Sequence, residues 1–65
     1  MENVKKQLRL IQQGLERQYE PLNELINRLK HEGKNIGEIE QEVMRMGLIQ
    51  MAYNALETTI RILES

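Results

Sequence analysis

The sequence predicts an all-α protein: an antiparallel two-helix hairpin that completes a helical bundle by dimerisation or with a partner. In the first half of the chain, leucines recur every seven residues. A glycine-containing turn follows near the middle, and the second half repeats apolar residues at helical spacing. One Pro and four Gly in 65 residues leave too little turn chemistry for a many-stranded β fold. We therefore expect residues 1–65 to form a single helical-hairpin domain.

The first helix is expected over residues 2–32. Its apolar seam follows the a/d spacing of a coiled coil with one polar exception, Gln18. Pro21 interrupts the segment, because it lacks the N–H that would bond to the carbonyl of Arg17 and its ring clashes there. Since the seven-residue phase continues across Pro21, we expect one helix kinked at that residue; two helices meeting near residues 19–21 are the alternative. The seam of this helix consists of Leu8, Ile11, Leu15, Gln18, Leu22, Leu25 and Leu29.

A turn over residues 33–35 is expected to separate the two helices. Gly33 is typical of the position just after a helix end. Asn35, with Glu38 three residues later, has the spacing of a capping box. The second helix is then expected over residues 36–63, with Gly47 as a point where it could break. Its seam consists of Ile39, Val43, Met46, Gln50, Tyr53 and Ile60.

The two seams predict one register. Folding the chain about residue 34 places Leu25 opposite Val43, and it places the polar Gln18 opposite the polar Gln50. Because the two polar seam residues coincide, we expect them to form one polar layer that fixes the register. Agreement between the two patterns favours the antiparallel hairpin.

The second helix has more apolar surface than one hairpin can bury. From residue 48 to residue 63 it is apolar on nearly every side, which is typical of a helix covered all round. The chain has no Cys to staple so small a domain, and this favours oligomerisation or a partner. Met44 and Met51 lie off the seam and fit such an interface. The predicted interface residues are Leu48, Ile49, Met51, Ala52, Ala55, Leu56, Ile62 and Leu63.

The sequence predicts no catalytic, cofactor-binding or metal site. His31, the single His, falls near a predicted helix end, where its positive form complements the helix dipole. Glu38 and Glu42 lie one turn apart, but the chain lacks the Glu-x-x-His pairs of a di-iron bundle. It also lacks the Gly-Lys-Ser/Thr of a phosphate-binding loop. We therefore expect a protein that is not an enzyme, with no cofactor and no small-molecule substrate.

Charge and hydropathy limit the partners. Nine Lys and Arg against ten acidic residues exclude a strongly basic nucleic-acid arm and an acidic tail. No stretch approaches the ~20 apolar residues of a membrane span. The N-terminal region has no apolar segment of a secretory signal, so we expect a cytoplasmic protein. Basic side chains do gather on the first helix, at Lys5, Lys6, Arg9, Arg17, Arg28 and Lys30.

The end of the second helix resembles a family of small helical proteins. The resemblance rests on a short chain built as one helical hairpin and on Ala55-Leu56-Glu57, Ile60, Ile62 and Leu63. It is similar to the small cochaperones of type III secretion needle proteins. This resemblance implies a two-helix protein that pairs with a helical-repeat chaperone to hold the needle subunit soluble.

The segment around the turn resembles a second family. The residues concerned are Leu25-Ile26, Lys30, Gly33, Ile36, Glu38 and Ile39. They are similar to the dimerisation hairpin of Sin-type antirepressors, which implies a hairpin that pairs with another copy.

These observations predict a helical protein-interaction module that acts as a small cochaperone, adaptor or regulator. It would mask an apolar helical surface of a partner protein. One alternative is a dimeric bundle that regulates by binding nucleic acid through the basic face of the first helix. A Sin-type dimerisation hairpin is the other.

Overall fold

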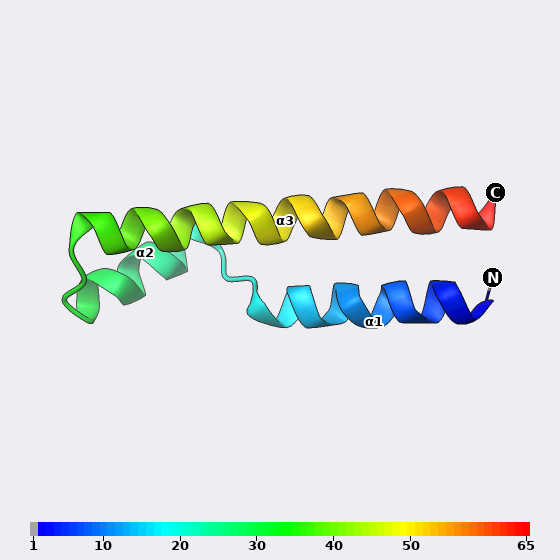
Figure 1. Cartoon of the computed structure of the whole chain (residues 1–65). Coiled ribbons are helices and arrows are strands. Elements are labelled where there is room, and N and C mark those ends of the chain that lie inside the picture. The colour runs from blue at the N-terminus through cyan, green and yellow to red at the C-terminus, as the bar shows by residue number, and fades with distance from the viewer. Residues whose placement is uncertain (1) are drawn as a thin grey trace.

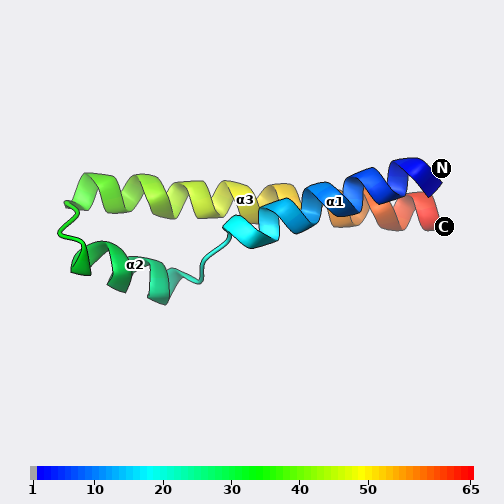
Figure 2. The same cartoon turned by 90° about the horizontal axis from the view of Figure 1, so that it is seen from below.

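In the computed structural model, which describes residues 2–65, the chain forms three helices and no strand. They are α1 (Glu2–Gln18), α2 (Leu22–His31) and α3 (Ile36–Glu64). α3 runs the length of the molecule, with α1 packed beside its C-terminal part and α2 beside its N-terminal part (Figure 1). α1 and α2 are not in line with each other (Figure 2). The all-α prediction is confirmed.

The prediction of one kinked helix over residues 2–32 was wrong, because the chain leaves the helical path between Gln18 and Leu22. Pro21 has φ −56° and ψ 144° and stands at the N-cap of α2, where its carbonyl accepts from the Leu25 N–H at 2.9 Å. Glu20 precedes a proline, which disfavours helical backbone there. Its N–H instead donates to the Met46 sulfur at 3.3 Å. Pro21 is therefore a helix start rather than a kink.

The turn between α2 and α3 is held by backbone bonds at both helix ends. Gly33 has φ +79°, a conformation that favours glycine. Its N–H donates to the Lys30 carbonyl at 3.1 Å, and the Lys34 N–H donates to the Leu29 carbonyl at 3.0 Å, which is a Schellman motif. The Asn35 side chain then accepts from the Glu38 N–H at 2.9 Å. α3 corresponds to the second helix expected over residues 36–63, and it continues unbroken through Gly47.

The main core lies where α2 meets α3. Its buried residues are Leu25, Leu29, Met46 and Ile49, and Leu15, Ile39 and Val43 pack against them. Further along α3, in the part beside α1, Ile60 is completely buried. Leu8 and Tyr53 are half-buried on the helices that meet there. The chain thus buries one face of α3 along most of its length.

The buried polar layer differs from the predicted one. Gln18 and Gln50 are both exposed, so the prediction of a Gln18–Gln50 layer was wrong. Gln12 is the buried polar residue, at 3% exposure. Its Nε2 donates to the Glu57 carboxylate at 2.9 Å and to the Tyr53 carbonyl at 3.3 Å. These bonds link α1 to α3 and satisfy the buried amide.

Two more predicted seam residues, Ile11 and Leu22, lie at the edge of the packing and are 52% and 50% exposed. The physical reason is the break before Pro21. Since α1 and α2 are separate helices, each turns about its own axis to pack on α3. On α1 this places Leu8, Gln12 and Leu15 toward α3, in place of a face that includes Ile11.

We predict that Pro21→Ala lowers the free energy of unfolding by about 0.4–1 kcal/mol. Proline at a compatible backbone position stabilises mainly by restricting the unfolded chain, and Ala removes that restriction. Urea unfolding followed by circular dichroism, at one fixed protein concentration, measures the change. A more stable Pro21→Ala variant would show that the chain prefers a continuous helix and would contradict the role of Pro21 as a helix start.

Candidate interaction surface

A row of exposed apolar side chains runs along α3, and we call it the α3 stripe. Its members share one helix face: successive spacings of four, three, four and seven residues place them within an arc of about 60°. Four of them are large and are 65–69% exposed. The α3 stripe consists of Met44, Leu48, Met51, Ala55 and Ile62.

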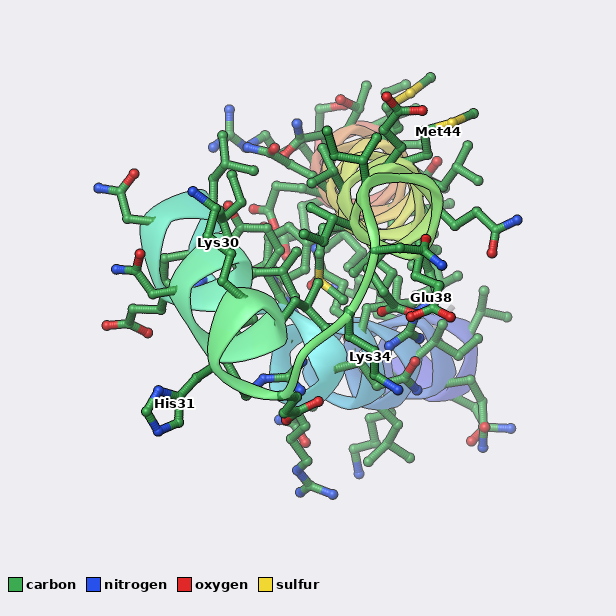
Figure 3. The ribbon with its side chains drawn as sticks, turned by 90° about the vertical axis from the view of Figure 1, so that its left-hand side faces the viewer. Lys30, His31, Lys34, Glu38 and Met44 are labelled. Carbon is green, nitrogen blue, oxygen red and sulfur yellow. The ribbon has the colours of Figure 1, made fainter. Side chains whose placement is uncertain are left out.

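The α3 stripe lies on the side of α3 that neither α1 nor α2 covers. The core-facing residues Met46, Ile49 and Ile60 lie almost diametrically opposite to it at ~100° per residue. Viewed along the helix axis, the Met44 side chain projects from α3 away from both other helices (Figure 3). α3 is therefore apolar on two opposite faces, and the chain buries one of them.

The surroundings of the α3 stripe are poor in charge. No charged residue occurs between positions 46 and 56. The Thr59 hydroxyl, one turn beyond Ala55, donates to the Ala55 carbonyl at 2.9 Å and so is already hydrogen-bonded within the helix. Glu57 is turned toward Gln12 on the other side of α3. A partner could cover the middle of this face without burying an unpaired charge.

The structure divides the predicted interface residues into three groups. Leu48, Met51, Ala52, Ala55 and Ile62 are exposed. Leu56 and Leu63 are half-buried along the edge of α3. Ile49 is 8% exposed and belongs to the core with Leu25, so it is not available to a partner in this conformation.

Ion pairs occupy several of the basic side chains expected to form a nucleic-acid face. Lys5 lies 2.8 Å from Glu2, and this hydrogen bond raises the pKa of Lys5. Arg9 reaches across to α3, where it lies 3.1 Å from Glu57 and 3.4 Å from Glu64. These contacts reduce the positive potential of the surface.

Arg28 is held in the same way, between Glu20 and Glu32 at 3.0 Å each. These hydrogen bonds raise the pKa of Arg28, and the bond from Arg28 lowers the pKa of Glu20. Half of the six basic side chains on the first predicted helix are therefore engaged with carboxylates of the same chain.

No group of three His, Asp or Glu side chains among residues 2–65 could hold a metal ion. His31 is exposed and points away from α3 (Figure 3). A shallow groove between α1 and α3 is lined by Leu15, Tyr19, Ile49 and Tyr53, with Glu16 as its one charged residue. Glu16, Tyr19 and Tyr53 are the titratable side chains that line this groove.

Gln12 is the residue whose role the sequence did not indicate. Its polar side chain within an apolar-periodic helix is a signal in principle, but α1 contains several Gln residues and periodicity alone favoured Gln18. Gln12 becomes identifiable only when Glu57 of α3 is placed opposite to it.

No family model matches this chain, and neither a curated protein nor a solved structure does. The resemblances to type III cochaperones and to Sin-type antirepressors therefore stay predictions. No helix in the described part of the chain is long and apolar enough to cross a membrane.

We predict that Glu57 makes stability depend on acid pH. The hydrogen bond from Gln12, followed by the charge of Arg9, holds the pKa of Glu57 below its ordinary value of 4.5. A carboxylate whose pKa is lowered in the folded state stabilises the fold above its unfolded pKa, and this contribution is lost as the pH falls through the folded pKa. The stabilisation is therefore complete above about pH 5 and declines below 4.5.

Glu57→Gln tests this pH dependence, since a protonated carboxyl and an amide are alike in charge. The wild type should have the higher melting temperature at pH 7, and the two curves should converge below pH 4.5. Thermal unfolding followed by circular dichroism over pH 3–7 measures the difference. A difference in melting temperature that stays constant over this range would show that Glu57 acts through packing rather than through its charge.

Proposed function

We propose that this chain is a non-enzymatic helical protein-interaction module that masks an apolar helical surface of a partner through the α3 stripe. Small cochaperones, adaptors and regulators work in this way, and we expect the protein to act in the cytoplasm. The observation that carries the proposal is the exposure of Met44, Leu48, Met51 and Ile62 on one continuous face of α3. Apolar patches of this kind on small proteins mark interaction sites.

The spacing of the α3 stripe suits a helical partner. Anchors separated by three, four and seven residues are the pattern with which one amphipathic helix contacts another. Two of the anchors, Met44 and Met51, have flexible, polarizable side chains that adapt to differently shaped partners. The absence of charge between residues 46 and 56 lets the centre of the contact exclude water. These features support an apolar helix as the ligand.

Two features of the surface speak against nucleic acid as the main partner. Phosphate binding needs free cationic side chains. Lys5, Arg9 and Arg28 are instead bound to carboxylates, which a phosphate would have to displace. The formal net charge of −1 adds no general attraction to a polyanion.

The partner can be identified by placing a photo-crosslinking amino acid at position 51 of the full chain. Crosslinking in extracts of the native source, followed by mass spectrometry, gives candidates, and the same amino acid at position 50 controls for nonspecific capture. Gln50 is exposed on α3 but lies about 100° from Met51 around the helix. The candidate is then purified and titrated with the wild-type chain.

We predict that Leu48→Glu combined with Met51→Glu weakens binding of the purified partner by at least 100-fold. Each large apolar anchor of an interface contributes ~2 kcal/mol, and the new carboxylates would be buried without counter-charges. Gln50→Glu on the same helix, and Lys6→Glu with Lys30→Glu on the basic face, should leave the affinity within a few-fold. Calorimetric titration measures binding, and circular dichroism checks the helix content.

Loss of binding in the Lys6→Glu and Lys30→Glu variant, with full binding by the α3 stripe variant, would overturn the proposed function. Binding that also falls steeply with salt would then point to nucleic acid or another anionic partner.

A further inference from the structure

The α3 stripe can pack against the α3 stripe of a second copy when the two helices run antiparallel and residue 53 lies at the centre of the contact. Met51 and Ala55 lie two residues on either side of that level, and Met44 and Ile62 lie nine residues away. Leu48 lies five residues before it, and Thr58, an exposed residue beside the α3 stripe, lies five residues after it. In an antiparallel pair of identical helices related by a two-fold axis, residues at equal distances on opposite sides of the axis face each other.

The facing residues also fit in size. Met51 of one copy would meet the small Ala55 of the other, and Leu48 would meet Thr58. Large residues opposite small ones let two helices approach closely and interdigitate. Met44 would meet Ile62 at both ends of the contact, which spans about 27 Å along the helix.

Charge does not oppose this arrangement. The central part of the contact, residues 46–56, contains no charged side chain. Arg45 and Arg61 flank the α3 stripe on opposite sides of the helix, so a two-fold axis does not bring them together. Each has a carboxylate nearby on its own helix: Glu42 lies 3.3 Å from Arg45, and Glu57 lies 3.5 Å from Arg61.

The surface area of the chain matches the size of one such interface. The accessible surface is 5174 Å² for a chain of 7.7 kDa. A compact folded monomer of this mass exposes about 4,300 Å². The excess of about 850 Å² is close to the ~800 Å² that each partner buries in a protein–protein interface of standard size. A single interface would therefore give the chain the surface of an ordinary folded protein.

We propose that a second copy of this chain occupies the α3 stripe when no other partner is bound, with the two α3 helices antiparallel and the two-fold axis at the level of residue 53. The homodimer is the resting form, in which each copy masks the apolar face of the other. This inference rests on the proposed function, since a partner helix must then displace the second copy.

Disulfide trapping tests the orientation, because the chain contains no Cys of its own. Met44→Cys and Ile62→Cys are made separately in the full chain. In the antiparallel dimer, the two copies of residue 44 lie about 27 Å apart along the axis, as do the two copies of residue 62. Neither variant alone should form a disulfide dimer on mild oxidation, whereas the equimolar mixture should form one. Gln50→Cys, on another face of α3, should not crosslink in any mixture.

Sedimentation equilibrium from 1 to 100 µM gives the mass independently. The wild type and Gln50→Glu should reach twice the 7.7 kDa monomer mass, and Leu48→Glu with Met51→Glu should remain at the monomer mass. If that double variant unfolds, the disulfide pattern of the single Cys variants still decides. A monomeric wild type at 100 µM would overturn the inference. Disulfides in the separate Cys samples would overturn the antiparallel register.

The two proposals fail in different ways. A monomeric chain that binds its purified partner through the α3 stripe would refute the homodimer and leave the proposed function standing. A chain that dimerises with the predicted disulfide pattern, and whose position 51 crosslinks to no other protein, would refute masking and displacement while leaving the dimer geometry standing.

Discussion

α3 has apolar side chains on two opposite faces, while α1 and α2 together cover only one of them. Burial of Met46, Ile49 and Ile60 gives the chain its core. The opposite face, from Met44 to Ile62, stays in contact with water. Since leaving apolar surface in water costs about 25 cal/mol per Å², that face stabilises any complex that covers it. The fold and the proposed function thus follow from the same helix.

The break before Pro21 determines how the covered face is built. α1 and α2 pack along different lines on the covered face of α3, where a single straight helix would follow only one line along it. The connection is fixed to α3 by the bond from the Glu20 N–H to the Met46 sulfur and to α2 by the Glu20–Arg28 ion pair. Gln12 holds α1 through its bonds to Tyr53 and Glu57. Polar contacts therefore tie α1 and the connection before α2 to α3, in addition to the apolar core.

The helix ends at the turn and the excess apolar surface of the second helix could be predicted from the sequence. The glycine at position 33 and the Asn35 cap have backbone requirements that few other residues meet, and both stand where the helices end and begin. The excess apolar surface after residue 48 was visible because three-, four- and seven-residue spacings persisted on more than one face of the helix. Those spacings correctly separated Met46, in the core, from Met51, on the exposed face.

Features that depend on how separate segments rotate could not be predicted in this way. The seven-residue spacing of the leucines continues across Pro21 because α1 and α2 both need apolar residues toward α3. A continuous spacing therefore did not require one continuous helix. The choice of Gln12 over Gln18 as the buried amide depends on the position of Glu57, some forty-five residues away in the sequence. The spacing of residues within one helix carries no information about a contact with a residue of another helix.

The accessibility of the methionine methyl groups tests the central claim most directly. In NMR spectra of the full chain with a soluble paramagnetic agent, the buried Met46 methyl serves as the internal reference. We predict that the Met44 and Met51 methyls are protected nearly as well as the Met46 methyl at high protein concentration or with the bound partner. In the variant that combines Leu48→Glu with Met51→Glu, the Met44 methyl should become accessible. Met44 and Met51 methyls that remain fully accessible under every one of these conditions would show that nothing covers this face of α3, and would contradict its role as the interaction surface.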